Sequence, residues 1–246
     1  MQRLKDILRR INGTFLCEVI GRRKDYYHGK WRSRYQRRKT IDHYLNATRQ
    51  PKLHLGCGGQ ALRGWLNSDI LNLNDGMIFL DVRERYPFED RSFHLVYSEH
   101  LVEHLAYEDS VHYFREAFRV LKPGGTCRTS TPDLSFLINL MQEDSEENRA
   151  YTEWAFCTYW PGKKPSRVLA VNHYFRSWGH QCLYDYALLK ETYQAAGFRE
   201  VRRVSVGESQ IPELRGIEKH GDVIGERWNR KESLVVEGTK PGNPKH

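Results

Sequence analysis

Short apolar runs alternate with helical periodicities along the chain from residue 51 onwards. Runs of β-forming residues that end in turn residues predict strands, and apolar residues three and four positions apart predict helices. We expect strands at 52–55, 65–70, 77–80, 93–98, 126–131, 201–206 and 233–237, and helices at 107–121, 134–141 and 184–196. This alternation is typical of βαβ units, so the sequence predicts an α/β fold with a doubly wound, mostly parallel sheet.

Turn and capping residues set the expected helix ends. Pro123 and the two glycines after it cannot continue the first of these helices. Asp133 is a typical N-cap for the second helix, and Gly197 is a typical C′ residue for the third.

Residues 1–50 differ from the rest of the chain in charge. They hold 14 Lys and Arg against four Asp and Glu, a net charge of +10, whereas the whole chain carries +8. Apolar residues of this leader recur at helical spacing, which predicts an amphipathic helix, as at Leu4, Leu8, Ile11 and Phe15. Three interpretations stay open: a basic helical extension that packs on the body, a helix that contacts an anionic membrane, and an arm that binds nucleic acid.

Composition argues against several classes of protein. The five cysteines are scattered and form no Cys-x-x-Cys pair, which disfavours a disulfide framework and a structural zinc site. The apolar runs are far shorter than the roughly 20 residues of a membrane-spanning helix. The N-terminus lacks the apolar segment of a secretory signal. We therefore expect a cytoplasmic protein, with peripheral contact at the inner membrane surface as an alternative.

A glycine turn follows the first expected strand. Gly56-Cys57-Gly58-Gly59 permits a tight turn and close approach of a ligand to the backbone. Asp69 and Asp81 end the next two strands, and an acid at the end of the second strand can accept hydrogen bonds from ribose hydroxyls. No Lys-Ser/Thr pair follows the glycines, which disfavours a phosphate-binding loop, and Ala61 replaces the third glycine of the dinucleotide fingerprint.

Three motifs, spread over about residues 51–133, resemble class I S-adenosylmethionine-dependent methyltransferases. They are the glycine turn at 55–59, the Pro-Phe segment at 86–96 and the Lys-Pro-Gly-Gly segment at 119–125. Residues 98–105 and 212–216 resemble, more narrowly, a bacterial subgroup of predicted methyltransferases with unassigned substrates. The resemblance implies a Rossmann-like fold, S-adenosyl-L-methionine as the cofactor and methyl transfer as the activity.

The resemblance also assigns the cofactor-binding residues. Gly56, Cys57 and Gly58 would approach the amino-acid and ribose parts of the cofactor, and Asp69 would hold the ribose hydroxyls. Asp81 and Val82 would face the adenine. Ser98 and Glu99 would line the methionine end of the cofactor. Two alternatives stay open, because Asp69 could be a simple turn residue and Asp81 could pair with a nearby arginine.

Candidate catalytic residues follow the fourth strand. His100 and His104 lie where this fold opens its active site, and either could act as a general base near neutral pH. Their spacing of four predicts that they share one face of a helix, and packing roles are the alternative. Glu103 directly precedes His104, which is not the His-Glu-x-x-His order of zinc enzymes, so no metal is expected.

The remaining candidates lie on the substrate side. His173 and His180 fall in or near an aromatic-rich insertion at about 145–183, which either covers a ring, sugar or acyl substrate or packs a helical subdomain. Glu213 and Arg215 either position a polar substrate or pair with each other.

The domain organisation follows from these assignments. We expect the basic extension at 1–50, a methyltransferase domain at 51–240 and a short tail at 241–246. The expected reaction is methyl transfer to an oxygen or nitrogen of a small-molecule or saccharide-like acceptor. The alternatives are an RNA methyltransferase that uses the leader and a binding module that keeps the fold without turnover.

Overall fold

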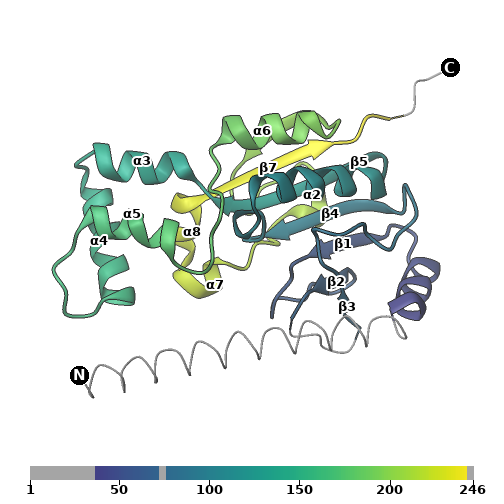
Figure 1. The fold of residues 1–246 in the computed structure, drawn as a ribbon, viewed down its shortest axis with the longest axis horizontal. Coiled ribbons are helices and arrows are strands. Elements are labelled where there is room, and N and C mark those ends of the chain that lie inside the picture. Colours follow the sequence, from purple (N-terminus) through teal and green to yellow (C-terminus); the bar gives the residue numbers. More distant parts are fainter. Residues whose placement is uncertain (1–36, 72–75, 243–246) are drawn as a thin grey trace, which may run out of the picture.

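The computed structural model describes residues 37–71 and 76–242, which fold around a central seven-stranded sheet (Figure 1). The strand order is β3-β2-β1-β4-β5-β7-β6. The strands are β1 (Lys52–Leu55), β2 (Leu66–Asp69), β3 (Ile78–Phe79), β4 (Phe93–Glu99), β5 (Leu121–Pro132), β6 (Arg199–Val204) and β7 (Ser233–Thr239). β7 runs antiparallel to β5 and β6, and the other pairings are parallel. The predicted α/β fold with a mostly parallel sheet is confirmed.

The register of the sheet brings three strand ends together. Leu55 pairs with Ser68 of β2 and with Ser98 of β4, and Asp69 pairs with Phe79 of β3. The residues that follow these strands therefore meet at one edge of the sheet. That edge is where open parallel sheets bind their ligands.

The helices cover the sheet unevenly. α2 (Tyr107–Val120) and α6 (Tyr186–Ala195) lie on the same face (Figure 1) and pack on the main hydrophobic core. Asp185 caps α6, where its side chain accepts a hydrogen bond from the Leu188 N–H. Residues 56–65 between β1 and β2 form turns rather than a helix.

β5 begins earlier than expected. The Lys-Pro-Gly-Gly segment predicted a turn, yet it lies within the strand. Leu121 pairs with Phe93 and the next pair is Thr126 with Leu95, so the four residues between them bulge out of the ladder. Gly124 has a φ of +80°, which a glycine adopts without strain. The turn residues thus make a bulge where a clean break between helix and strand was expected.

A second group of helices forms a lobe at one end of the sheet (Figure 1). It comprises α3 (Leu134–Gln142), α4 (Glu146–Tyr159), α5 (Arg167–Arg176), α7 (Gly221–Ile224) and α8 (Glu226–Glu232). Asp133 caps α3, as predicted, by accepting a hydrogen bond from the Ser135 N–H. Aromatic side chains of α4 and α5 pack with Trp228 of α8 in one cluster. The two C-terminal helices were not predicted, because each is too short to show a helical period.

The C-terminal part of the leader packs on the body. Residues 37–47 are helical, and Ile41 is buried in the main core. The Tyr44 hydroxyl donates to the Lys52 carbonyl and accepts from the Lys52 N–H, both at 2.9 Å. The expected domain boundary at residue 50 therefore lies just after a helix that packs on the body. The apolar stripe between Leu4 and Phe15 lies outside the described residues. No described helix is long and apolar enough to cross a membrane.

Candidate active site

The glycine turn and the acid of β2 are joined by hydrogen bonds. Gly56 and Gly58 have φ values of +63° and +51°, in the region that favours glycine. The Gly58 N–H donates to Asp69 Oδ2 at 2.8 Å, and the Leu71 N–H donates to Asp69 Oδ1 at 2.8 Å. Asp69 therefore shapes the turn and stays half-exposed beside it.

The space around the two glycines fits the cofactor that the resemblance implies. A Cβ on Gly56 would lie 2.7 Å from the end of the Leu101 side chain, which would have to shift, and the φ of +63° also favours glycine at this position. A Cβ on Gly58 would meet no described atom within 4 Å, so the space beside this glycine is open to a ligand. A cofactor with a ribose would find this space next to the half-exposed Asp69 carboxylate. The turn would hold S-adenosyl-L-methionine through this pair.

Asp81 and Val82 follow β3 at the same edge. The buried Asp81 carboxylate holds the Arg83 guanidinium through two hydrogen bonds of 2.9 and 2.7 Å. The pairing with a nearby arginine, which the sequence left open, is present. Val82 is buried in the main hydrophobic core. The adenine role of both residues stays a prediction.

Cys57, Ser98 and Glu99 occupy structural positions at the strand ends. Burial, with the nearby Asp69 charge, raises the pKa of the Cys57 thiol to about 12, so it is no nucleophile at neutral pH. Ser98 is buried and accepts a hydrogen bond from the Tyr113 hydroxyl at 2.9 Å. The Glu99 carboxylate accepts hydrogen bonds from the N–H groups of Lys219 and His220. Contact of these residues with the cofactor stays a prediction.

A pocket of about 390 Å³ opens beyond the ends of β4 and β5, and we call it the histidine pocket. It is lined by His100, His104, Pro132, Tyr159, Tyr174, Trp178, His180, His220, Val223, Ile224 and Glu232. These residues come from the segment after β4, from the end of β5 and from the helical lobe with its connecting segments. Three of the predicted histidines, at 100, 104 and 180, therefore share one cavity.

The predicted helix face for His100 and His104 is wrong. Residues Val102–His104 form a single 3-10 turn, and His100 lies before it with a φ of +47°. The His100 N–H donates to the Ser130 carbonyl at 2.9 Å, which ties this residue to β5 instead of a helix. The two histidines reach the same pocket because the chain bends, not because of helical periodicity.

His100 and the fully buried Glu103 form a pair. His100 Nδ1 lies 2.9 Å from Glu103 Oε1, and the His100 ring stacks on His220 with 3.8 Å between centroids. Burial opposes the charged imidazolium, but Glu103, Glu232 and Glu99 outweigh it and raise the pKa of His100. His100 Nε2 has no hydrogen-bond partner among the described residues. This arrangement resembles a base whose second nitrogen is held by a carboxylate.

Two histidines of the insertion segment lie in different surroundings. His180 Nδ1 is 2.7 Å from the Tyr174 carbonyl, and burial lowers the pKa of His180. His173 packs among Tyr159, Trp160 and Trp178 and does not line the histidine pocket.

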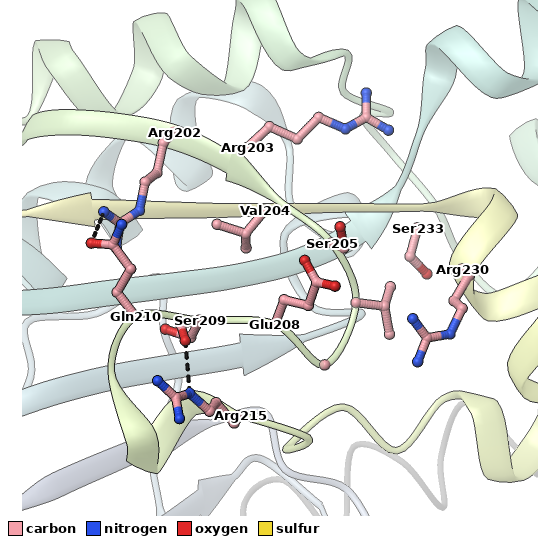
Figure 2. A pocket seen from close by; sticks show the side chains of 12 residues that line it. Arg202, Arg203, Val204, Ser205, Glu208, Ser209, Gln210, Arg215, Arg230 and Ser233 are labelled. Carbon is pink, nitrogen blue, oxygen red and sulfur yellow. Dashed lines mark hydrogen bonds between the residues drawn. The ribbon is translucent and has the colours of Figure 1, made fainter.

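Glu213 and Arg215 lie apart from the histidine pocket. Arg215 lines a separate cavity of about 980 Å³, shown in Figure 2, which we call the arginine cleft. Glu213 lines a third cavity, next to Lys52 and His94. The Arg215 Nε donates to the Ser209 carbonyl at 2.8 Å. Neither residue lines the histidine pocket, and their role in substrate binding stays a prediction.

Sequence reasoning missed three groups in or beneath the pocket. Glu103 lies three residues after His100, and that spacing was the available signal for the pair. His220 and Glu232 come from the short C-terminal helices, where Glu232 accepts hydrogen bonds from the hydroxyls of Tyr151 and Tyr174. Nothing in the sequence links these residues with His100, because only the fold brings them together.

Comparisons with known proteins agree with the motif reading. Residues 72–129 match the family model of a methyltransferase domain. No protein of curated function matches the sequence.

Several solved structures are similar in fold. A methyltransferase of Archaeoglobus fulgidus shares 16% identity, with 86% of this chain and 94% of that chain covered and a TM-score of 0.43. A methyltransferase of Thermotoga maritima shares 14% identity, with 94% of this chain and 98% of that chain covered and a TM-score of 0.43. A third structure is phosphoethanolamine N-methyltransferase 2 of Haemonchus contortus, bound to S-adenosyl-L-methionine. It shares 14% identity, with 78% of this chain and 49% of that chain covered and a TM-score of 0.42.

The activity class follows from the chain's own features. The glycine turn lies at the carboxyl end of β1 beside Asp69, and the sheet has the expected mostly parallel order. The methyltransferase model matches the segment that runs on from this edge through β4 to β5. The chain therefore carries a methyltransferase domain, and its glycine turn and sheet order fit S-adenosyl-L-methionine as the cofactor.

Proposed function

We propose that the enzyme methylates an oxygen or nitrogen atom of a small-molecule or saccharide-like acceptor bound in the histidine pocket. The observation that carries this proposal is the His100–Glu103 pair, which places an imidazole with an unpartnered Nε2 in this pocket, one residue beyond β4. The glycine turn that would hold the cofactor lies at the same edge of the sheet.

The size and lining of the pocket suit a small acceptor. Its volume of about 390 Å³ lies within the roughly 300–1,000 Å³ of small-molecule sites. Trp178 and Val223 line it and are 49% and 73% exposed, so they offer an apolar rim. An aromatic ring at such a rim can stack on a sugar face or a planar ring. The partly buried histidines and the buried Glu232 supply polar contacts in the pocket.

The chemistry asks for positioning and for removal of one proton. S-adenosyl-L-methionine supplies a methyl group on a positively charged sulfur. The acceptor atom forms a bond to the methyl carbon as the carbon–sulfur bond breaks, and the electron pair of that bond stays on sulfur. The acceptor's proton passes to Nε2 of His100, while Glu103 holds Nδ1 and stabilises the imidazolium. His104 lines the same pocket and is the second candidate base.

Turnover of labelled cofactor against saccharide, lipid-linked, small-molecule and RNA acceptors tests the proposal. We expect label in a small-molecule or saccharide acceptor. Trp178→Ala should raise the KM for that acceptor and leave the affinity for S-adenosylhomocysteine unchanged. Phe175→Ala is the matched control, because Phe175 is equally exposed and does not line the pocket.

Two results would contradict the proposal. Labelling of RNA alone would move the acceptor site to another surface. Equal KM values for Trp178→Ala and Phe175→Ala would show that the acceptor does not use the rim of the histidine pocket.

A further inference from the structure

We propose that Glu103, His104 and His180 form a binding site for a divalent transition-metal ion of the zinc class. One ligand atom of each of these residues lies within 4.8 Å of the others. His104 and His180 line the histidine pocket, and Glu103 is fully buried beneath it. Two imidazoles and one carboxylate are a ligand set that zinc enzymes use, with a further position open for water or substrate.

The tautomer of His180 favours metal binding. Its Nδ1 lies 2.7 Å from the Tyr174 carbonyl oxygen, which can only accept a hydrogen bond. Nδ1 must therefore carry the hydrogen, and the lone pair of the neutral ring lies on Nε2. A metal-binding histidine commonly donates its other ring N–H to a backbone carbonyl in this way.

Neighbouring residues also orient the Glu103 carboxylate. The Thr131 hydroxyl donates to Glu103 Oε2 at 3.0 Å, and His100 Nδ1 lies 2.9 Å from Oε1. Ligating carboxylates are usually fixed by outer hydrogen bonds such as the one from Thr131. The main-chain carbonyl of Glu103 accepts from the N–H groups of Gln181 and Cys182, so the backbone holds Glu103 against the loop that carries His180.

The proposed ion would act on the acceptor. A divalent ion in the pocket lowers the pKa of a coordinated hydroxyl group, which eases transfer of its proton to His100. This role rests on the proposed function, whereas binding of the ion does not. It favours acceptors with a hydroxyl group over amines, because a metal-coordinated amine has no lone pair left to attack the methyl carbon.

Metal titration of the full-length chain after chelator treatment tests the site. We expect one Zn²⁺ per chain by calorimetry, and Co²⁺ in its place should give the visible absorption of a tetrahedral or five-coordinate site. His104→Gln and His180→Gln should each weaken binding at least about a hundredfold, and Thr131→Val by about tenfold to a hundredfold. His220→Gln is the matched control, because His220 lines the same pocket outside the cluster.

The outcomes separate this proposal from the proposed function. Absence of stoichiometric Zn²⁺ binding, an octahedral Co²⁺ spectrum, or equal binding by His180→Gln and His220→Gln would overturn the metal site. The Co²⁺ spectrum of the wild-type chain decides the matter even where a variant fails to fold. Methylation that persists in the metal-free chain would leave the proposed function standing without the ion. Stoichiometric binding without any methylated acceptor would leave the metal site standing alone.

Discussion

The histidine pocket and the arginine cleft differ in whether their polar side chains already have partners within the protein. The cleft is the larger cavity, about 980 Å³ against 390 Å³, and four arginines line it. Each of these has a partner within the protein: Arg202 with Glu237, Arg203 with Asp133, Arg215 with the Ser209 carbonyl, and Arg230 with Glu226. In the smaller pocket, His100 Nε2 has no partner among the described residues.

This difference indicates which cavity is built for chemistry. A guanidinium that already pairs with a carboxylate must break that contact before it can hold a ligand. A buried imidazole nitrogen without a partner costs folding free energy, so its retention favours a functional role. The cleft also lies beside β6, which is the outermost strand on the side of the sheet away from β1 and its glycine turn. Unpaired groups near the cofactor edge therefore point to the reaction better than cavity size does.

The largest effect is expected at His100. If Nε2 accepts the proton of the acceptor, His100→Gln should lower turnover by roughly 10²–10⁴-fold. The affinity for S-adenosylhomocysteine, measured by calorimetry, should not change. Arg203→Gln in the arginine cleft is the control and should keep its turnover. A loss of only a few fold in His100→Gln would leave positioning as the source of catalysis and remove the base from the pocket.

A large effect on stability is expected at Arg128, beneath the arginine cleft. Its fully buried guanidinium donates to Glu218 and Glu237 at 2.6 Å and to the Glu208 carbonyl at 2.8 Å. Arg128→Met leaves the buried Glu218 carboxylate without a cationic partner and Glu237 with Arg202 alone, which should lower the free energy of unfolding by about 3–5 kcal/mol. Urea unfolding measures this change.

Arg202→Met is the matched control for that experiment. Its side chain is 36% exposed, and it also pairs with Glu237. We expect its loss to cost at most about 1 kcal/mol, because solvent screens the pair. Equal losses of unfolding free energy in Arg128→Met and Arg202→Met would mean that the buried contacts of Arg128 with Glu218 and Glu237 add no more stability than an exposed pair.

A smaller effect is expected at Asp69, on the cofactor side of the histidine pocket. Asp69→Ala removes charge-assisted hydrogen bonds worth about 1.5–3 kcal/mol, so the affinity for S-adenosylhomocysteine should fall about tenfold to a hundredfold. Calorimetry measures this affinity, with Glu213→Ala as the control at an exposed acid. A change below about twofold would assign Asp69 to the turn alone, through its bonds to Gly58 and Leu71.

The fold could be predicted from sequence because its signals are local. The strand at 52–55 and the Asp133 cap appear as expected, since apolar runs and capping residues act over a few positions. The helix ending at Val120 runs straight into β5, because the Lys-Pro-Gly-Gly turn is absorbed as a bulge by pairing with β4. Only long-range strand pairing decides between those two outcomes.

The candidate site could be predicted in part. His100, His104 and His180 were singled out, and the fold brings them into one pocket. His220 and Glu232 were missed because they lie more than a hundred residues from His100 on helices too short to show a period. Glu213 and Arg215 were named as substrate candidates, but a polar loop carries no information about which cavity it lines, and the fold places them in two other cavities.

The sign of one pKa change sharpens the comparison further. Burial opposes the charge on His100, but Glu103 and the other acids raise its pKa above the ordinary 6.5. Glu103→Gln removes the nearest of these charges, so the pKa of His100 should fall. NMR titration of the imidazole in the chelator-treated chain measures it, with Glu213→Gln as the control. An unchanged pKa in Glu103→Gln would show that the pair does not form in solution.

The same pair should link stability to pH. A histidine with a raised pKa contributes stability at a pH below 6.5, and that contribution is lost as the pH rises through the raised value. Urea unfolding at several pH values should therefore show this contribution in the wild-type chain and a weaker one in Glu103→Gln.

The smallest effect is expected at Arg230, on the rim of the arginine cleft. Arg230 Nε lies 2.9 Å from Glu226 Oε1, and both side chains are 55% exposed. Exposed pairs at this helical spacing are worth about 0.3–0.5 kcal/mol, so Arg230→Gln should barely change the free energy of unfolding. Turnover and the affinity for S-adenosylhomocysteine should match the wild-type values. A loss of turnover above about tenfold would reverse the comparison, because the larger cavity would then hold the acceptor.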